Sequence, residues 1–419
     1  MLSVEEARER ILSFFSVLEA DDTPVLEALG QVLAEDVVAG FDIPPLANSA
    51  MDGYAVQSGS LKGASIGAPV ALSVIGSVAA GELPTDRVAP GTAVRIMTGA
   101  PIPDGADAVV PFEDTDEADR RSSGADLGRI AIRVEVEQGA DIRPAGQDVK
   151  SGERVLTKGT ALRPAEIGVL ASLGHDRVRV TRRPVVAILS TGDEILEPGG
   201  PHAPGKIYDS NSYSVAAAVL KSGGVPRKLG IARDNIDAVG AKLREGLTSD
   251  MLITTAGVSK GDYDMVKDVL AKHGQIDFWS VRMRPAKPLA FGMLDAGGGR
   301  QVPHLGLPGN PVSALVAFEQ FGRAAIRKMM GKTAVDRPTI EAVLDEPIYN
   351  TDGRRVYARA VVTRRNGVYH VRLTGHQSSN LLTSMSRANG LAICPEDVAK
   401  KDAGEMVQVQ MLDWPEDMI

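Results

Sequence analysis

The chain has 419 residues, of which 43% are hydrophobic and 24% charged. It should therefore fold into several domains, because single cores stop growing at roughly 250–300 residues. A net charge of −8 and an aromatic content of only 4% argue against nucleic-acid binding. Cys394 is the only cysteine, which excludes an intrachain disulfide and a multi-cysteine metal site. The N-terminus has no signal-peptide pattern and no apolar run is long enough to span a membrane, so we expect a cytoplasmic protein.

The first third of the sequence predicts a helix followed by β structure. Apolar residues at helical spacing indicate an amphipathic helix over residues 3–19, opened by a capping box of Ser3 and Glu6. Short Val- and Ile-rich runs between residues 66 and 137 predict a small β domain. The polar segment 113–128 within it is expected to be an exposed loop with no other role.

The middle of the chain alternates between strand and helix patterns. Strands are expected at 184–189 and 251–255, and helices at 212–224, 236–247 and 264–274. This alternation predicts a parallel α/β sheet. A long helix should run from Asn310, as N-cap, through Pro311 to about Gly331. Alternating segments beyond Pro338 predict a last, all-β domain.

One generic motif is rejected. GPHAPGK (200–206) matches the start of a phosphate-binding P-loop, but Ile207 stands where Ser or Thr should bind magnesium. Two prolines stiffen the segment, and no helix is expected to begin there.

Polar turns follow the predicted strands where a parallel sheet binds its ligands. In STGDE (190–194), Ser190, Thr191 and Gly192 can present hydroxyls and amides to a phosphate, and Glu194 can hold a divalent cation. Taken alone, this segment could equally be a capped turn. YDSN (208–211), RDN (233–235) and AGVSKGDYD (256–264) occupy comparable positions, which favours a ligand site over structural turns.

Two further segments suit an anion. RMRPAKP (282–288) sets Arg284 and Lys287 in a loop bounded by prolines. LPGNPVS (307–313) places backbone amides and Ser313 at the start of a helix, although it could be no more than a well-capped helix start.

These motifs, in this order, resemble the molybdopterin molybdenumtransferase family. The resemblance also includes PPLANSAMDGYAV (44–56), VRIMTGAPIPDGADAVV (94–110), DIRPAGQDV (141–149) and GHQSSNLLTSMSRANGLAI (375–393), so it runs nearly end to end. The family includes bacterial MoeA, a plant E domain and the E domain of gephyrin.

The resemblance implies a multidomain α/β plus β fold. A discontinuous base of helix and β structure would comprise 1–45 and 147–181, with an inserted β lid at 46–146. A MogA-like α/β domain that binds molybdopterin would span 182–331, and a C-terminal β barrel 332–419. The resemblance further implies a homodimer whose active site lies between the α/β domain of one subunit and the lid of the other.

The family's functional residues are carried over position by position. Those associated with catalysis are Asp52, Thr98, Arg143, Asp148, Glu194, Asp234 and Asp264. Those associated with substrate or anion binding are Ser190, Thr191, Gly192, Gly257, Ser259, Arg284, Lys287, Pro308, Asn310, Pro311, Ser378 and Ser379. The chain departs from the common KPGKP and GGVS patterns at Arg284, Ala286 and Ala256, which affects the expected anion geometry.

The implied reaction inserts molybdenum from molybdate into adenylyl-molybdopterin and releases AMP. Asp52, Glu194 and Asp264 would hold Mg²⁺ against the phosphates. Arg284, Lys287 and the Ser379 hydroxyl would hold molybdate. Thr98, Arg143 and Asp148 would act in the lid that excludes water. A molybdopterin adenylyltransferase and molybdoenzyme maturation factors are the expected partners, with neither nucleic acid nor membrane.

Two alternatives stay open. The chain could insert tungsten, or bind the pterin without turnover. It could also be a scaffold like the receptor-clustering E domain of gephyrin, although 419 residues leave no room for a long linker and a fused second catalytic domain.

Overall fold

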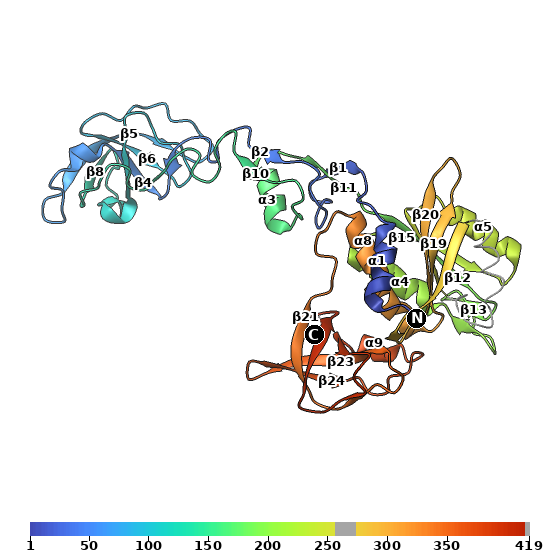
Figure 1. Ribbon diagram of the computed structural model, residues 1–419. Helices are drawn as coiled ribbons and strands as arrows, with labels where there is room; N and C mark the ends of the chain where they lie inside the picture. The colour runs from blue at the N-terminus through green and yellow to red at the C-terminus, as the bar shows by residue number, and fades with distance from the viewer. Residues whose placement is uncertain (256–273, 415–419) are drawn as a thin grey trace. The chain divides into compact units, whose positions relative to one another are not determined.

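The computed structural model describes residues 1–255 and 274–414, in two compact units. The first unit combines residues 1–34, 159–167 and 177–419, and the second comprises residues 35–158 and 168–176. Figure 1 shows the elements of each unit. The predicted helix over 264–274 lies outside the described residues except for its last position. No helix in the described ranges is long and apolar enough to cross a membrane.

The first helix is shorter than its sequence pattern predicts. The capping box is confirmed, because the Glu6 N–H donates to Ser3 Oγ at 3.1 Å and the Ser3 N–H donates to Glu6 Oε2 at 2.8 Å. However, α1 (Val4–Ser13) ends six residues before the predicted boundary at residue 19. The Leu18 N–H instead donates to the Met329 carbonyl, and β1 (Ala20–Pro24) pairs with β11 (Arg177–Thr181). Tertiary hydrogen bonds therefore override the helical spacing of the apolar residues.

The first unit contains a six-stranded sheet. Its strand order is β15 (Val225–Ala232), β12 (Val185–Thr191), β16 (Met251–Thr255), β20 (Gln301–Leu307), β19 (Pro288–Asp295) and β17 (Gly274–Ser280). The first four strands are parallel, as predicted. Strands β19 and β17, which the alternation of strand and helix patterns does not predict, add antiparallel pairings at one edge.

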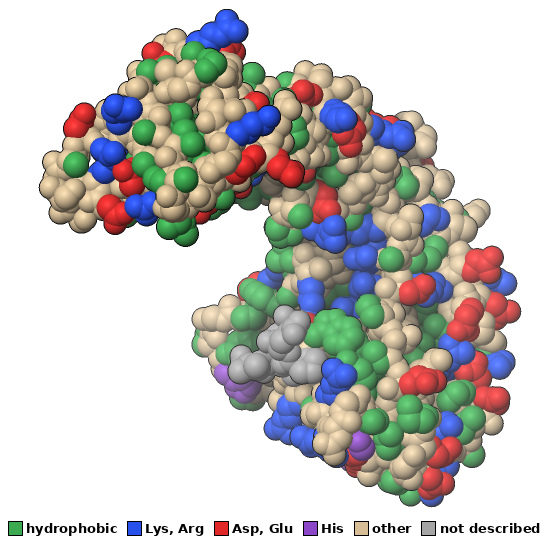
Figure 2. All heavy atoms as spheres, turned by 90° about the vertical axis from the view of Figure 1, so that its left-hand side faces the viewer, with side chains coloured by type: hydrophobic (Ala, Val, Ile, Leu, Met, Phe, Trp, Pro, Cys, Tyr) green, Lys and Arg blue, Asp and Glu red, His purple; other side chains and the backbone are tan. Residues whose placement is uncertain are grey.

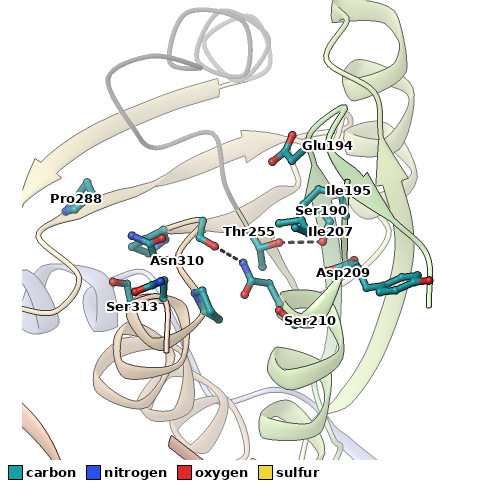
Figure 3. A pocket seen from close by; sticks show the side chains of 16 residues that line it. Ser190, Glu194, Ile195, Ile207, Asp209, Ser210, Thr255, Pro288, Asn310 and Ser313 are labelled. Atoms are coloured by element: carbon teal, nitrogen blue, oxygen red, sulfur yellow. Dashed lines mark hydrogen bonds between the residues drawn. The ribbon is translucent and has the colours of Figure 1, made fainter. Parts of the chain in front are cut away.

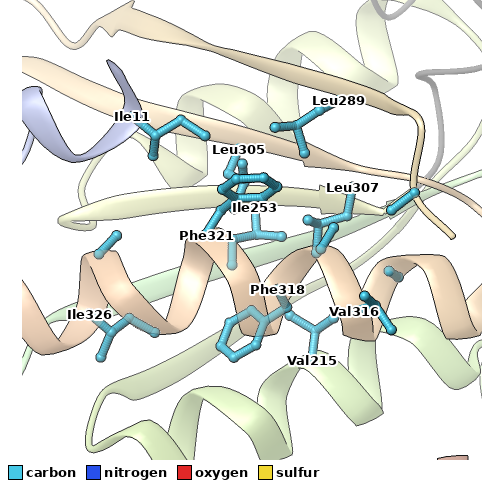
Figure 4. Packing of buried hydrophobic residues seen from close by; sticks show 14 of the residues in the cluster. Ile11, Val215, Ile253, Leu289, Leu305, Leu307, Val316, Phe318, Phe321 and Ile326 are labelled. Atoms are coloured by element: carbon cyan, nitrogen blue, oxygen red, sulfur yellow. The ribbon is translucent and has the colours of Figure 1, made fainter. Parts of the chain in front are cut away.

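Helices cover both faces of this sheet. Helix α5 (Ile236–Gly246) packs on the face that carries Ala187 and Leu252. The other face is covered by α1, α4 (Ser210–Ser222), and a long helix made of α7 (Pro311–Ala317), the π-helical turn η3 (Phe318–Gly322) and α8 (Arg323–Met329). Figure 4 shows Phe321 next to Leu305 and Ile253 of the sheet, inside this core. Burying one such side chain contributes about 1.5–3 kcal/mol, so this core fixes the strand ends that carry the site.

The predicted C-terminal β domain is a closed five-stranded barrel. Its strands are β21 (Thr339–Leu344), β23 (Arg355–Arg365), β24 (Val368–Leu373), β25 (Gly390–Cys394) and β27 (Met406–Met411). The pairing of β23 with β25 closes it. A short strand from the α/β part, β18 (Met283–Arg284), extends the sheet beside β23. Around the barrel lie β22 (Ile348–Tyr349), β26 (Lys400–Lys401) and the single turn α9 (Thr383–Ser386).

The second unit is built on a five-stranded sheet, which confirms the predicted small β domain. Its order is β7 (Ala108–Pro111), β4 (Gly53–Val56), β6 (Thr92–Ile96), β5 (Val70–Val78) and β8 (Arg129–Ile132). The two-stranded pairs β2 (Val37–Val38) with β10 (Arg154–Leu156), and β3 (Asn48–Ser49) with β9 (Ile142–Arg143), complete its strands among the described residues. Helix α3 (Pro164–Ser172) has residues in both units.

The polar segment 113–128 is not merely an exposed loop, contrary to the prediction. It contains helix α2 (Glu117–Ser123), preceded by the 3-10 turn η2 (Phe112–Asp114). Glu117 is buried and accepts hydrogen bonds from Tyr54 Oη at 2.5 Å and Arg95 Nη2 at 2.9 Å. A carboxylate can be buried when it is paired in this way. The many polar residues of the segment therefore did not mean that all of it is exposed.

Charged side chains cover much of the surface. Figure 2 shows acidic and basic side chains interspersed over most of one face, with one group of neighbouring Lys and Arg side chains. The chain is acidic overall, so any concentration of positive charge is a local feature.

Candidate active site

A pocket of about 600 Å³ lies at the carboxyl ends of the parallel strands. Ser190 from β12, Thr255 from β16 and Pro308 after β20 contribute to its wall, as the sequence analysis expected of these turns. Figure 3 shows Ser190 and Thr255, with Glu194, Asp209, Ser210, Asn310 and Ser313 around the same space. The complete lining is Ser190, Glu194, Ile195, Ile207, Tyr208, Asp209, Ser210, Asn211, Thr255, Pro288, Pro308, Gly309, Asn310, Pro311, Ser313 and Asn380.

The STGDE segment turns sharply after β12 and exposes one carboxylate. Ser190 Oγ lies 2.9 Å from Thr255 Oγ1, which joins the ends of two strands. Gly192 has φ of +144°, and a Cβ at this position would lie 2.6 Å from Glu194 Oε2. Only glycine therefore allows the Glu194 carboxylate to lie over the turn. That carboxylate is exposed and has no hydrogen bond or ion pair with the described residues.

Asp234 holds this turn in place. The Asp193 N–H donates to Asp234 Oδ2 at 3.2 Å, and the Asp234 N–H donates to Asp193 Oδ1 at 3.3 Å. Lys206 Nζ also donates to the Asp193 carbonyl at 2.7 Å. Asp234 was expected to be catalytic, and the structure places it outside the pocket lining, as a residue that positions the loop carrying Glu194.

The YDSN segment supplies pocket residues that the predicted site set omitted. Asp209 is buried and caps α4 by accepting from the Ser212 N–H at 2.9 Å. Asn211 Nδ2 donates to the Gly309 carbonyl at 2.7 Å, which fixes the orientation of the amide. Asn211 Oδ1 is buried without a partner among the described residues. The position of YDSN before a predicted helix is the feature of the sequence that could have predicted Asn211 as a pocket residue.

The segment before α7 behaves as predicted in outline. Pro308, Asn310 and Pro311 line the pocket, with Pro311 in the first turn of the helix. Asn310 occupies the N-cap, although its side chain makes no capping hydrogen bond there. The Val312 N–H instead donates to the carbonyl of Ser379 at 3.1 Å, so the C-terminal GHQSSN segment reaches the helix start.

A second pocket, of about 390 Å³, contains a buried arginine that the sequence analysis missed. Arg359 of β23 is 1% exposed and lines this pocket with Arg284, His376, Gln377 and Ser378. Arg359 Nε donates to Ser384 Oγ at 3.1 Å, and Nη2 donates to the Ser378 carbonyl at 3.0 Å. Burial lowers its pKa to about 10. No ion pair joins Arg359 to the residues that the structure describes, so a buried cation faces the pocket without a counter-ion.

Arg284 and Lys287 have different surroundings. Arg284 Nη2 donates to the Tyr349 carbonyl at 2.5 Å, and Nη1 lies 3.7 Å from Asp352 Oδ2, so the barrel partly occupies its donors. Lys287 is exposed, and its ammonium has no partner among the described residues. Its neighbour Pro288 lines the first pocket, whereas Arg284 lines the second. Ala286 between them has φ of +74°, a conformation that favours glycine.

The GHQSSN segment connects the two pockets. Ser378 lines the second pocket and Asn380 the first. Ser378 Oγ donates to Asn380 Oδ1 at 2.5 Å. The predicted residues Ser378 and Ser379 therefore lie in a strip of chain that borders both.

Four predicted residues belong to the second unit. The Thr98 N–H and Oγ1 donate to Asp52 Oδ1 at 2.7 and 2.8 Å, and these bonds lower the pKa of the Asp52 carboxyl. Arg143 lies in β9, where it pairs with Asn48 of β3. Asp148 is exposed, and its N–H donates to the Ile43 carbonyl at 2.9 Å. The structure thus joins Asp52 to Thr98, a pair that the sequence placed 46 residues apart.

The predicted metal ligands are described only in part. Within residues 1–255 and 274–414, no three His, Cys, Asp or Glu side chains cluster closely enough to hold a metal ion. Gly257, Ser259 and Asp264 lie outside the described residues, and Ala256, the departure from GGVS, lies there too. Of the histidines in residues 1–255 and 274–414, His376 lines the second pocket and the others line neither.

An α/β domain with a pocket lined by the loops at its strand ends, followed by a small barrel, defines a multidomain protein that is built to bind a small ligand. Three protein-family models match the chain: the MoeA N-terminal region (domain I and II) over residues 2–174, a probable molybdopterin binding domain over 187–328, and the MoeA C-terminal region (domain IV) over 341–412. The chain belongs to the MoeA family of molybdopterin molybdenumtransferases and acts in molybdenum cofactor biosynthesis.

Individual relatives match along their whole length. Molybdopterin molybdenumtransferase 2 of Mycobacterium tuberculosis is 39% identical, over 98% of this chain and 99% of the relative. The molybdopterin molybdenumtransferase of Haemophilus influenzae is 34% identical, over 98% of both chains. A crystal structure of the molybdopterin biosynthesis MoeA protein of Pyrococcus horikoshii superposes with a TM-score of 0.80 at 30% identity, covering 99% of this chain and 100% of that one.

Proposed function

We propose that this chain inserts molybdenum from molybdate into adenylyl-molybdopterin and releases AMP. The observation that carries the proposal is the pairing of two adjoining pockets with different chemistry. Among the residues that the structure describes, the Glu194 carboxylate at the strand ends has no ion-pair partner, and neither has the buried Arg359 guanidinium of the neighbouring pocket. A nucleotide-linked pterin with a metal at its phosphates suits the first, and a tetrahedral oxyanion suits the second.

The pterin nucleotide would occupy the pocket at the strand ends. Ser190, Thr191 and the amide of Gly192 would contact a phosphate there, at the turn that glycine makes possible. The buried, unpartnered Oδ1 of Asn211 would accept a hydrogen bond from an N–H of the pterin ring. A buried acceptor of this kind gains a full hydrogen bond when substrate binds, since it has no other partner to give up.

The residues present fit the Mg²⁺ ion that the family implies. Mg²⁺ prefers oxygen ligands and commonly takes one or two protein carboxylates together with substrate phosphates. Glu194 offers a carboxylate with no competing partner in the described ranges, at the edge of the nucleotide pocket. Asp264 and the Asp52 of a second subunit remain proposed ligands. Bound there, the ion would neutralise charge that develops on the phosphates.

Molybdate would lie in the pocket of Arg359. The guanidinium of Arg359 and that of Arg284 can donate paired hydrogen bonds to a tetrahedral oxyanion. Lys287 would approach from the side of its neighbour Pro288, which lines the first pocket, and the Ser378 and Ser379 segment would lie between the two substrates. A fixed cation outside any ion pair attracts a dianion strongly in a protein that is otherwise acidic.

The reaction would be driven by positioning and electrostatics. The two dithiolene thiols bind molybdenum in place of one molybdate oxygen, which leaves as water with the two thiol protons. A water molecule cleaves the phosphoanhydride link, and AMP leaves. The chain's own groups hold the two substrates against each other and exclude bulk water. We further propose that a homodimer completes the site, with Asp52, Thr98, Arg143 and Asp148 supplied by the lid of the other subunit.

AMP release tests this proposal. The protein, adenylyl-molybdopterin and Mg²⁺ are incubated with and without molybdate, and AMP is measured by chromatography. We expect AMP to appear only slowly until molybdate is added. Release that needs tungstate and ignores molybdate would indicate the tungsten alternative. Tight pterin binding with no AMP under any condition would indicate a binding protein and contradict the proposal.

A further inference from the structure

Four cationic side chains gather at the far end of the long helix from the pockets. Arg323 and Arg327 lie on α8, Lys332 follows its C-terminus, and Arg183 precedes β12. Arg323 and Arg327 stand one turn apart on α8, and the Lys332 N–H donates to the Arg327 carbonyl at 3.0 Å. Arg183 Nη1 donates to the Gly223 carbonyl at 3.2 Å, and Gly223 lies next to the Met330 side chain, so Arg183 reaches the same end of the helix. None of the four lines either pocket described above.

The three arginines bond to backbone carbonyls instead of carboxylates. Arg323 Nη1 donates to the Val335 carbonyl and Arg327 Nε to the Ala334 carbonyl, both at 2.8 Å. Arg183 donates to the Leu29 carbonyl at 2.8 Å. Throughout residues 1–255 and 274–414, no carboxylate forms an ion pair with any of the four.

Two acidic side chains on segments next to the cluster are already engaged, and Arg183 Nη2 donates to the carbonyl of a third acidic residue, Glu27, at 3.3 Å. Glu319 Oε2 pairs with Arg337 Nε at 2.8 Å, and Asp336 pairs with Arg8. Arg8 Nε is itself buried without a partner in the described part of the chain. The cluster therefore keeps its positive charge in a chain whose net charge is −8.

Stabilisation of a helix end does not account for the whole cluster. Cations near a helix C-terminus interact favourably with its carbonyls, which explains Arg327 and Lys332. Arg323, however, is the first residue of α8 and is only 7% exposed. A buried guanidinium without a counter-ion is costly unless a bound anion offsets its charge.

We propose that Arg183, Arg323, Arg327 and Lys332 form a binding site for a phosphate dianion, either free or carried by a nucleotide. Guanidinium groups match phosphate oxygens with paired hydrogen bonds, and each arginine here retains N–H donors beyond those given to carbonyls. Lys332 adds a point charge at the edge of the site. Burial and the three arginines lower its pKa to about 8, and a bound dianion would oppose that effect.

Chemical labelling of Lys332 reports on this site alone. The intact protein is treated with an amine-reactive reagent near neutral pH, and labelling is quantified residue by residue by mass spectrometry. Inorganic phosphate, pyrophosphate and AMP are added in separate arms, with sodium chloride at matched ionic strength. Lys62, an exposed lysine of the second unit, is the internal control.

We expect phosphate-bearing anions to protect Lys332 several-fold, with Lys62 and the chloride arm unaffected. Protection by AMP at lower concentration than by phosphate would identify a nucleotide as the ligand, and the reverse would identify free phosphate. R327Q should require about tenfold or more anion for the same protection, because a charge-assisted hydrogen bond is lost. R244Q is the matched control, since Arg244 is an exposed arginine in the last turn of α5.

Three results would overturn the proposal. Equal protection by chloride would show simple screening, and unchanged protection in a folded R327Q would remove the cluster from the effect. A Lys332 that no anion protects would mean that its surroundings, including a second copy of the chain, already satisfy it. Melting temperatures of both variants establish that they are folded.

Discussion

Replacing Arg359 by Met should raise the molybdate concentration that the protein needs much more than it lowers the stability of the fold. Arg359 is 1% exposed, and burial lowers its pKa from 12.5 to about 10. That change corresponds to about 3 kcal/mol against the charged form, at 1.36 kcal/mol for each factor of ten. R359M removes this penalty with a side chain of similar length, and it loses two charge-assisted hydrogen bonds that contribute about 1.5–3 kcal/mol each. The free energy of unfolding should therefore fall by no more than about 3 kcal/mol.

The effect of R359M on molybdate should be much larger. A charge-assisted hydrogen bond contributes about 1.5–3 kcal/mol, so the molybdate concentration for half-maximal AMP release should rise at least about tenfold. Affinity for adenylyl-molybdopterin should change little, because Arg359 lies outside the first pocket. R364M is the matched control, an exposed arginine on the same strand. A variant destabilised by more than about 3 kcal/mol with an unchanged molybdate requirement would show that Arg359 is structural.

Four further predictions follow from particular residues. E194Q should abolish AMP release while the melting temperature stays unchanged, and normal release would remove Glu194 from the metal site. K287A should raise the molybdate requirement more than it weakens pterin binding; a lower melting temperature with an unchanged molybdate requirement would indicate only a structural role. His304 is fully buried, and burial lowers its pKa to about 3. Between pH 6.5 and 3 the unfolded chain binds a proton at this histidine that the folded chain excludes. The free energy of unfolding should therefore decrease as the pH is lowered, by up to about 1.4 kcal/mol per pH unit. In H304N this decrease should be shallower. Light scattering should show a dimer, and a fully active species of 44.2 kDa would contradict the shared site.

Local sequence signals predicted much of the α/β part. The buried strand ending at Thr191, the helix capped by Gly223 and the start of the long helix at Pro311 all have short-range causes in burial, backbone conformation and proline geometry. The rejection of a P-loop also agrees with the structure, where strand β14 (Ile207–Tyr208) begins after residue 206. These features depend on residues close together in the chain.

Long-range contacts explain what the sequence did not show. The end of α1 is decided by a hydrogen bond from Leu18 to Met329, and the burial of Glu117 by Tyr54 and Arg95. The strands β17 and β19 form an antiparallel edge of the sheet, which the alternation of strand and helix patterns does not predict.

The candidate site shows the same division. Motif positions predicted Ser190, Glu194, Pro308 and Asn310 in one pocket. Arg359 was missed because it stands in a segment interpreted only as a barrel strand. Ala358 and Ala360 beside it point into the barrel core, so Arg359 lies on the opposite face of β23. There it meets Ser378 and Arg284, which come from distant parts of the chain, and no local pattern predicts that meeting.

The ratio of molybdenum transferred to AMP released tests the central claim most directly. The protein is given adenylyl-molybdopterin, Mg²⁺ and molybdate for a single turnover, and pterin-bound molybdenum and free AMP are measured in the same sample. Insertion coupled to cleavage predicts that the two products appear together and in equal amounts, and that both are lost in E194Q. AMP that accumulates without pterin-bound molybdenum would mean that the protein is a hydrolase of the adenylylated pterin and would contradict the account.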